Sequence, residues 1–223
     1  MHIPSFIEQI LERPDAMIQL QALQSALEAE KKRRQDFYDW VTEEEVKAEF
    51  INGQVIVHSP VKRRHWNVSG LLSRLLSFYA SGKQLGQVGI EKVMIALTRN
   101  DYEPDIVFFS KEKSDLFTDD QVLFPAPDFV VEILSKKTAS TDRGTKKDDY
   151  AAHGIQEYWI VDPFKQRIEQ YILASASTTY FPAKIHQYGE MIESTVLRGF
   201  HIPVEAVFDE RANLKALRKL MDQ

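Results

Sequence analysis

The chain of 223 residues contains no cysteine, which excludes disulfides and thiolate metal sites. This composition fits a reducing compartment, so we expect a cytoplasmic protein. Long apolar runs are also missing: the most apolar helical segment, VSGLLSRLLSFYA, contains Arg74 and is too short to span a bilayer. The N-terminal MHIPSFIEQILERPD lacks the basic and apolar regions of a signal peptide. We therefore expect a soluble protein with no membrane association.

An excess of positive charge is absent as well. The net charge is −5 and the sequence pI is about 5.7, which argues against a general nucleic-acid coat. Short basic clusters do occur, and they usually mark solvated surface. They are KKRR (31–34), KRRH (62–65), Lys136-Lys137 and Lys146-Lys147. One such patch, or a metal ion that changes the charge of a site, still allows an acidic protein to bind a polyanion.

What is present is a chain with enough apolar residues for a sizeable core, at 43% hydrophobic and 11% aromatic. Residues 14–34 carry Leu20, Leu23 and Leu27 at helical spacing and predict a helix with one apolar stripe, a candidate docking or dimer surface. In residues 49–58, Asn52-Gly53 predicts a β-hairpin. An amphipathic helix that ends near Gly82 is predicted next; its apolar positions are Val68, Leu71, Leu72, Leu75, Leu76 and Tyr79.

The second half of the chain alternates strands and helices. VGIEKVMIAL, PDIVFF and PDFVVEIL are candidate strands, followed by a helix capped at Ser140 or Thr141 that runs to about His153 and stops at Gly154. EYWIVD is a central strand, RIEQYIL and KIHQYG an antiparallel pair, and residues 209–223 a last helix. This order predicts an α/β sandwich around a mixed sheet.

The apolar strand in PAPDFVVEILSKKT contains Glu132, where burial penalises a carboxylate. Asp105 enters the earlier strand EPDIVFF, so both acids can approach each other if the two strands pair near their starts. A hard divalent ion, Mg²⁺ or Mn²⁺, would then offset their repulsion. Taken singly, each acid also has a structural explanation, as a turn cap or as the partner of a cation on the covering helix. Asp128 is explained by its Pro-Asp turn.

The helix behind this strand presents Asp142, Lys146 and Tyr150 at i, i+4 and i+8 on one face. It could return Lys146 toward the carboxylates, where an ammonium can orient a nucleophilic water and offset developing charge. The alternative is an exposed pair of Lys146 with Asp149. Lys147 points about 100° away and is the weaker candidate.

The ordered phrases EFINGQVIVHSP, YEPDIVFFS, PAPDFVVEILS, D-x3-K-x3-Y and AAHGIQEYWIVDP resemble the Uma-two family of restriction-endonuclease-like proteins. The resemblance runs from about residue 49 to 163, and more weakly to LRGFHIP. It implies a branch of the PD-(D/E)xK nuclease superfamily: a restriction-endonuclease-like mixed sheet flanked by helices at 41–223, with a helical extension at 1–40.

The resemblance also implies the roles of the site residues. Asp105 matches the PD aspartate and Glu132 the second acid, and these two with the backbone carbonyl of Ile133 would hold the ion. The parent motif has its lysine two residues after the second acid, where this chain has Leu134; Lys146, with Tyr150 following, takes that place. Lys136 replaces a proline usual in this branch.

Two further residues, Glu49 and His65, match recurrent family positions. Glu49 would be an extra ligand or water-holder at the rim, whereas a lone histidine at a helix start is more often a cap or a structural hydrogen-bonding residue.

The function implied is a Mg²⁺-dependent endonuclease that hydrolyses DNA and leaves 5′-phosphates, without an organic cofactor. A catalytically inactive nuclease-fold module for DNA or protein binding is the alternative. A homodimer scaffold, with its interface on helix 14–34 and the last helix, is compatible with either.

Overall fold

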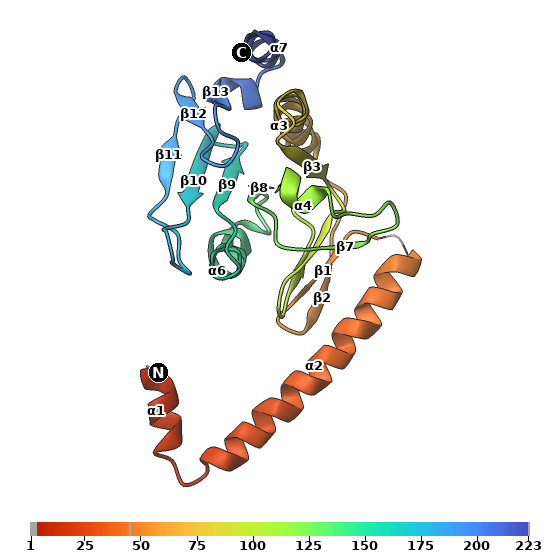
Figure 1. The fold of residues 1–223 in the computed structure, drawn as a ribbon, viewed down its shortest axis with the longest axis vertical. Coiled ribbons are helices and arrows are strands. Elements are labelled where there is room, and N and C mark those ends of the chain that lie inside the picture. The colour runs from red at the N-terminus through yellow and green to blue at the C-terminus, as the bar shows by residue number, and fades with distance from the viewer. Residues whose placement is uncertain (1–3, 45, 223) are drawn as a thin grey trace.

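The computed structural model describes residues 4–44 and 46–222, whose arrangement is drawn in Figure 1. The helices are α1 (Ser5–Leu11), α2 (Ala16–Glu44), α3 (Arg63–Gly82), α4 (Lys111–Ser114), α5 (Ala139–Thr141), the π-helix η1 (Asp142–Lys146), α6 (Lys147–Ala152), the 3-10 helix η2 (Val204–Val207) and α7 (Glu210–Met221). The strands are β1 (Ala48–Ile51), β2 (Gln54–Val57), β3 (Gly86–Ile90), β4 (Met94–Ala96), β5 (Asp101–Tyr102), β6 (Ile106–Ser110), β7 (Leu123–Phe124), β8 (Phe129–Ile133), β9 (Glu157–Asp162), β10 (Arg167–Ile172), β11 (Lys184–His186), β12 (Met191–Glu193) and β13 (His201–Pro203). Among these residues no helix has both the length and the apolar character needed to cross a membrane.

The strands form two main sheets and a short β12–β13 pair. The six-stranded sheet has the order β11-β10-β9-β8-β6-β3, in which β8 and β9 run parallel and all other neighbours antiparallel. The second sheet has the order β2-β1-β5-β4-β7. The predicted mixed α/β fold, flanked by helices and preceded by an N-terminal helical segment, is confirmed.

The six-stranded sheet is covered on both faces because its central strands are apolar throughout. In β8, Phe129, Val131 and Ile133 pack with α3, whereas Val130 on the opposite face packs with Tyr150 of α6. Side chains alternate between faces along a strand. Glu132 has the parity of Val130 and therefore lies on the α6 side.

Several local predictions are confirmed. Asn52 and Gly53 have φ of 51° and 79°, as a tight hairpin between β1 and β2 requires. All six apolar positions predicted for α3 are buried, and this helix ends at Gly82. Strands β10 and β11 pair antiparallel as expected. Gly154 follows α6 with a φ of 75°, in the left-handed conformation that stops a helix.

Other local predictions are corrected. The segment 88–97 is not one strand: β3 and β4 belong to different sheets, because Glu91 and Lys92 between them adopt positive φ values of 54° and 34°. Ser140 and Thr141 are not helix caps, since both lie inside α5.

The N-terminal helix is longer than predicted. It continues to Glu44 because Phe37 and Val41 extend its apolar stripe and are buried near Phe50, with the Phe37 and Phe50 ring centroids 5.7 Å apart. Arg34 fixes the same stretch through Nε and Nη2, each 2.6 Å from an Asp101 carboxylate oxygen. The outer part of α2 extends away from the sheets (Figure 1), and its Leu23 is 58% exposed. The division at residue 40 stays a prediction, since α2 crosses it unbroken.

Candidate active site

Strands β6 and β8 bring two acids face to face. These strands are antiparallel, with Ile106 opposite Val131, so the next pair in the same register is Asp105 and Glu132. The start of one strand therefore meets the end of the other, and side chains of directly opposed residues share a face. Both carboxyl-bearing residues are buried, each 5% exposed. The two acids are opposed as expected, but the expected pairing near both strand starts is wrong, because the strands are antiparallel.

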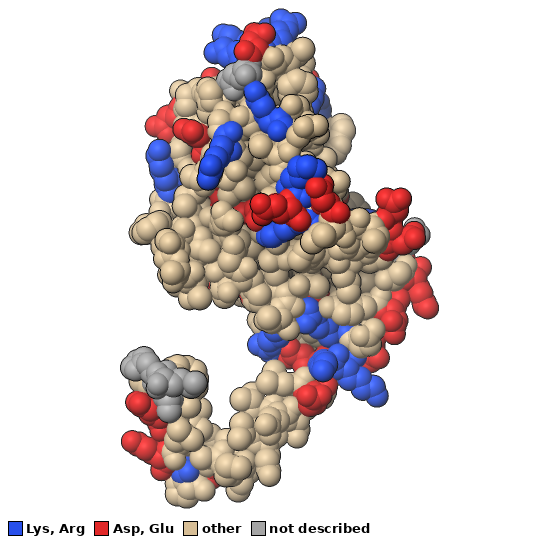
Figure 2. Space-filling model, in the orientation of Figure 1, with Lys and Arg blue, Asp and Glu red and all other residues tan. Residues whose placement is uncertain are grey.

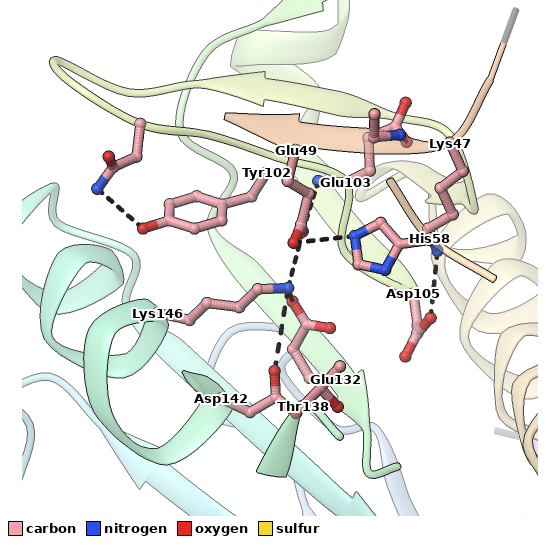
Figure 3. Close-up of polar contacts among 12 residues, drawn as sticks. Lys47, Glu49, His58, Tyr102, Glu103, Asp105, Glu132, Thr138, Asp142 and Lys146 are labelled. Atoms are coloured by element: carbon pink, nitrogen blue, oxygen red, sulfur yellow. Dashed lines mark hydrogen bonds and ion pairs between the residues drawn. The ribbon is translucent and has the colours of Figure 1, made fainter. Parts of the chain in front are cut away.

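Lys146 lies at the centre of the buried cluster drawn in Figure 3. Its Nζ donates to Oε1 of Glu49 at 2.8 Å and to Oε1 of Glu132 at 2.9 Å. The Tyr150 hydroxyl donates to the same Glu132 oxygen at 2.9 Å. Asp142 Oδ1 lies 3.9 Å from this ammonium. One lysine is thus shared by three carboxylates.

The distribution of charge in this cluster leaves an excess of carboxylate. Burial disfavours the Glu49 carboxylate, but Lys146 and His58 outweigh that effect and hold the pKa of Glu49 at about 2. Burial, with repulsion from Asp142 and Asp105, raises the pKa of Glu132 to about 8, although Lys146 opposes the rise. Burial likewise raises the pKa of Asp142 to about 6. The Lys146 ammonium is thus matched by Glu49, and Glu132 is the surplus acid.

A second group of side chains surrounds Asp105. His65 Nε2 lies 3.0 Å from Oδ2 of Asp105, and the Ile133 amide donates to the same oxygen at 2.7 Å. Lys47 Nζ lies 3.5 Å from Oδ1 of Asp105 and 3.0 Å from Glu91 Oε2. Burial opposes ionisation of Asp105, yet His65 and Lys47 lower its pKa overall. Asp105 therefore carries its charge.

This arrangement fits a divalent cation. Ligand atoms of His65, Glu91 and Asp105 lie within 4.8 Å of one another, a spacing that one ion can bridge. Oδ1 of Asp142 is buried without a hydrogen-bond partner among the described residues, and its one cationic neighbour is Lys146 at 3.9 Å, so this oxygen could accept a further bond. In a strand the amide and carbonyl of one residue point toward the same neighbour, so the Ile133 carbonyl is directed toward the Asp105 side. Oxygen donors of this kind suit Mg²⁺ or Mn²⁺.

The π-helical turn η1 sets the position of Lys146. A turn of this type inserts one extra residue and leaves backbone groups without their usual helical partners. Here the Tyr158 hydroxyl, from β9, donates to the Asp142 carbonyl at 3.1 Å and attaches the turn to the sheet. Lys146 and Tyr150 are both buried, at 3% and 0% exposure. The regular α-helix assumed from the sequence is thus replaced by a wider turn. The three residues expected on its inner face, Asp142, Lys146 and Tyr150, are still buried.

The predicted site residues fall into two adjoining groups. Glu49, Glu132, Lys146 and Tyr150 meet around the lysine ammonium, whereas His65 contacts Asp105. Glu49 is only 2% exposed, so it lies inside the cluster instead of at a rim.

The alternatives weighed for these residues have different outcomes. Lys146 makes no exposed pair with Asp149; that carboxylate instead accepts from Tyr102 and Asn100. Glu132 does pair with a cation of the covering helix, and this cation is Lys146, so the pairing fits a structural and a catalytic role alike. Asp128 lies apart, bound to Lys113 and to the Ser110 amide.

Three contacts were not predicted from the sequence. Lys47 supplies a second ammonium at Asp105, His58 Nε2 lies 3.1 Å from Glu49 Oε2, and Glu91 reaches the Lys47 ammonium. Lys47 directly precedes β1 and His58 directly follows β2, so the predicted hairpin was the sequence signal that both lie close to Glu49. Nothing local marks Glu91, whose position depends on the positive-φ turn after β3.

The mixed sheet, its flanking helices and this buried cluster define a restriction-endonuclease-like α/β protein. A crystal structure of a chain described as a putative nuclease, from Anabaena variabilis, has the same fold: its TM-score is 0.64 at 17% identity, over 74% of this chain and 90% of that chain. At this identity the likeness concerns the fold.

The family described as Uma2, putative restriction endonuclease, matches residues 34–205, and the chain belongs to that family. The match begins earlier and ends later than the resemblance read from the motifs. A Synechocystis protein described as uncharacterized is 30% identical over 128 residues, which are 56% of this chain and 71% of that protein.

Proposed function

We propose that this protein is a Mg²⁺-dependent endonuclease that hydrolyses DNA phosphodiester bonds, with Mn²⁺ able to substitute. The observation that carries the proposal is the apposition of Asp105 and Glu132 on one sheet face, in a cluster with more carboxyl groups than Lys146 can neutralise when they ionise. When bound, a divalent ion lowers the pKa of a coordinated water and polarises a phosphate oxygen. Asp105, Glu132 and the Ile133 carbonyl are its proposed ligands.

The other residues hold these groups and supply charge. Burial opposes the charge on Lys146, but Glu132, Glu49 and Asp142 together raise the pKa of this lysine well above its ordinary value, so it stays protonated. Lys146 would orient the attacking water and offset charge on the phosphate. Tyr150 holds the Glu132 carboxylate through its hydroxyl, and His65 holds that of Asp105. By analogy with the superfamily, the products carry a 5′-phosphate.

The test is plasmid nicking by wild type and by Glu132→Ala, with and without Mg²⁺. We expect cleavage by wild type only with the metal, and none by the variant. Circular dichroism checks that the variant is folded. A folded Glu132→Ala protein that nicks DNA as fast as wild type would falsify the assignment. Asp128→Ala is the matched control, because that acid is also buried and directly precedes β8 but lies outside the cluster.

An inactive DNA-binding or protein-interaction module is the second candidate. The state of Lys146 favours it: this lysine is 3% exposed, and its ammonium already donates to two carboxylates, so it has little freedom to contact a substrate. Tight DNA binding that does not change with Mg²⁺, together with no nicking, would select this module. Cleavage that requires Mg²⁺ would exclude it.

We also propose that the protein acts as a homodimer in the cytoplasm, paired through the outer part of α2. No residue from 16 to 27 is charged, and Leu20, Leu23 and Leu27 are 45%, 58% and 44% exposed. Figure 2 shows this stretch almost free of Lys, Arg, Asp and Glu. The same spacing of three and four residues passes through the charged Glu30 and Arg34 before it reaches Phe37 and Val41, which are buried against the body of the protein.

A second copy is a suitable occupant because two uncharged helices do not repel each other. The last helix contributes less than predicted, since Ala216 and Leu220 of α7 pack in the core formed with α3. Sedimentation velocity of Leu23→Lys should give half the mass of wild type, whereas Leu214→Lys on α7 should not change it. Equal masses for wild type and Leu23→Lys would remove this interface.

A further inference from the structure

Trp66 is the most exposed tryptophan of the chain, at 64%, and it adjoins the candidate site. The residue before it, His65, contacts Asp105 directly. The other two tryptophans differ: Trp40 is 36% exposed and Trp159 is fully buried. An indole ring is costly to leave in water, and such rings are concentrated where proteins bind partners. The first turn of α3 therefore presents an aromatic surface beside the proposed catalytic centre.

Three cations, Lys62, Arg63 and Arg64, precede Trp66 at the start of α3. Arg63 precedes Trp66 by three residues, a spacing that puts side chains on the same side of a helix, and Lys62 is the extended residue directly before α3. Within residues 4–44 and 46–222, neither of these nor Arg64 forms an ion pair. Lys111, by contrast, is an exposed cation that is paired, with Asp115. The positive charge at this helix start is thus available to an anion.

A second exposed ring and more cations lie at the C-terminal ends of β8 and β9. The guanidinium carbon of Arg64 lies 4.4 Å from the ring centroid of Phe164, which follows β9 and is 51% exposed. Strands β8 and β9 are parallel, so the loop after β8, with exposed Lys136 and Lys137, leaves from the same end of the sheet. Asp105 also lies there, because β6 starts where β8 ends.

We infer that the surface formed by the start of α3 and the ends of β8 and β9 binds an unpaired stretch of DNA. A base would stack on Trp66, and phosphates would pair with Lys62, Arg63 and Arg64. This inference rests on the proposed nuclease function for the nature of the substrate. A paired base hides its ring faces within the duplex, so the exposed indole can stack only on an unpaired or extruded base. The cations bind the backbone at any sequence. The substrate class is therefore single-stranded DNA, or duplex with an unpaired site.

Binding is measured in EDTA, so that it is separated from cleavage. A Trp40→Phe protein leaves Trp66 as the exposed tryptophan, and its fluorescence should be quenched by a short single-stranded deoxyoligonucleotide. Trp66→Ala should weaken single-strand binding about five- to hundredfold, as expected for the loss of one stacked base. Trp66→Phe should retain most of the affinity, because it keeps an aromatic ring. Arg63→Ala should lower the slope of log affinity against log salt by about 0.7.

The outcomes separate this inference from the proposed function. Single-strand affinity of Trp66→Ala within about twofold of wild type overturns the stacking site, and so does an equal loss of affinity for the fully paired duplex. If wild type cleaves plain duplex with Mg²⁺ and Trp66→Ala cleaves it equally well, the inference fails while the nuclease stands. Binding that depends on Trp66, without Mg²⁺-dependent cleavage of any DNA, supports the inference and removes the nuclease.

Discussion

Replacing Glu132 by glutamine removes one carboxyl charge from the buried cluster and keeps the shape of the side chain. The amide oxygen can still accept from Lys146 Nζ and from the Tyr150 hydroxyl, which now lie 2.9 Å from Glu132 Oε1. We expect Glu132→Gln to raise the free energy of unfolding of the metal-free protein above pH 5, because the carboxyl group it removes is the surplus acid of the cluster.

The size of the effect follows from the pKa of Glu132, which burial raises from 4.5 to about 8. Above pH 4.5 the unfolded chain loses this proton while the folded protein keeps it, so the group destabilises the folded state progressively until pH 8. At about 1.4 kcal/mol for each pKa unit, the full effect is at most about 5 kcal/mol. The advantage of Glu132→Gln over wild type should therefore be near zero at pH 4.5, grow up to pH 8 and then stay constant.

Urea unfolding in EDTA, followed by circular dichroism from pH 5 to 8.5, measures this difference. Lys146→Met tests the opposite direction: it leaves buried carboxylates without their cation and should cost about 3–5 kcal/mol. Lys147→Met, at a partly exposed position beside Asp148 and outside the cluster, is the matched control and should change stability by less than about 0.5 kcal/mol. A pH-independent difference between Glu132→Gln and wild type, or a Lys146→Met protein as stable as wild type, would refute the charge distribution described for the cluster.

Three further outcomes are expected. Mg²⁺ at about one hundred times its dissociation constant should raise the unfolding free energy of wild type by about 2.7 kcal/mol and leave Glu132→Gln nearly unchanged in calorimetry, and an equal rise in both would move the ion away from Glu132. Tyr158→Phe removes the hydroxyl that holds η1 and should cost about 1 kcal/mol in urea unfolding, with faster amide exchange in α6; unchanged exchange would mean that the bond is dispensable. Gly86→Ala should destabilise by several kcal/mol, because a Cβ there would overlap the Phe109 carbonyl oxygen at a φ of 147°; a thermal midpoint equal to wild type would contradict this.

Much of the fold follows from local patterns in the sequence. The α3 stripe, the Asn52-Gly53 hairpin and the apolar strand β9 are each defined within a few residues, and the structure has them. The extent of α2 was underestimated because the charged run at 28–34 looked like an end, whereas Phe37 and Val41 pack against another part of the chain. Long-range packing of this kind leaves no local signal.

The candidate site was predictable in its residues and less so in its contacts. The positions of the two acids on neighbouring apolar strands suggested that they meet, but the expected pairing near both strand starts was wrong, because strand direction is not encoded locally. The bond between Lys146 and Glu49 joins residues separated by 97 positions, and it depends on how the two sheets meet. His58 and Lys47 reach the cluster through the same meeting of the two sheets. These partners decide which carboxylate keeps its proton, so the charge state of the site could not be derived from the motif.

The widened turn at η1 has a consequence for how insertions and deletions act on this protein. One residue in a helix corresponds to about 100° of rotation, so loss of one position between Asp142 and Lys146 would turn every later side chain of α6 relative to the sheet. The exposed Thr145 sits in that stretch, where substitution of the side chain should be harmless and removal of the residue severe. The number of residues in this segment is therefore constrained more strongly than their type. A lysine at another position of this helix would need a different number of residues before it to point at the same carboxylates.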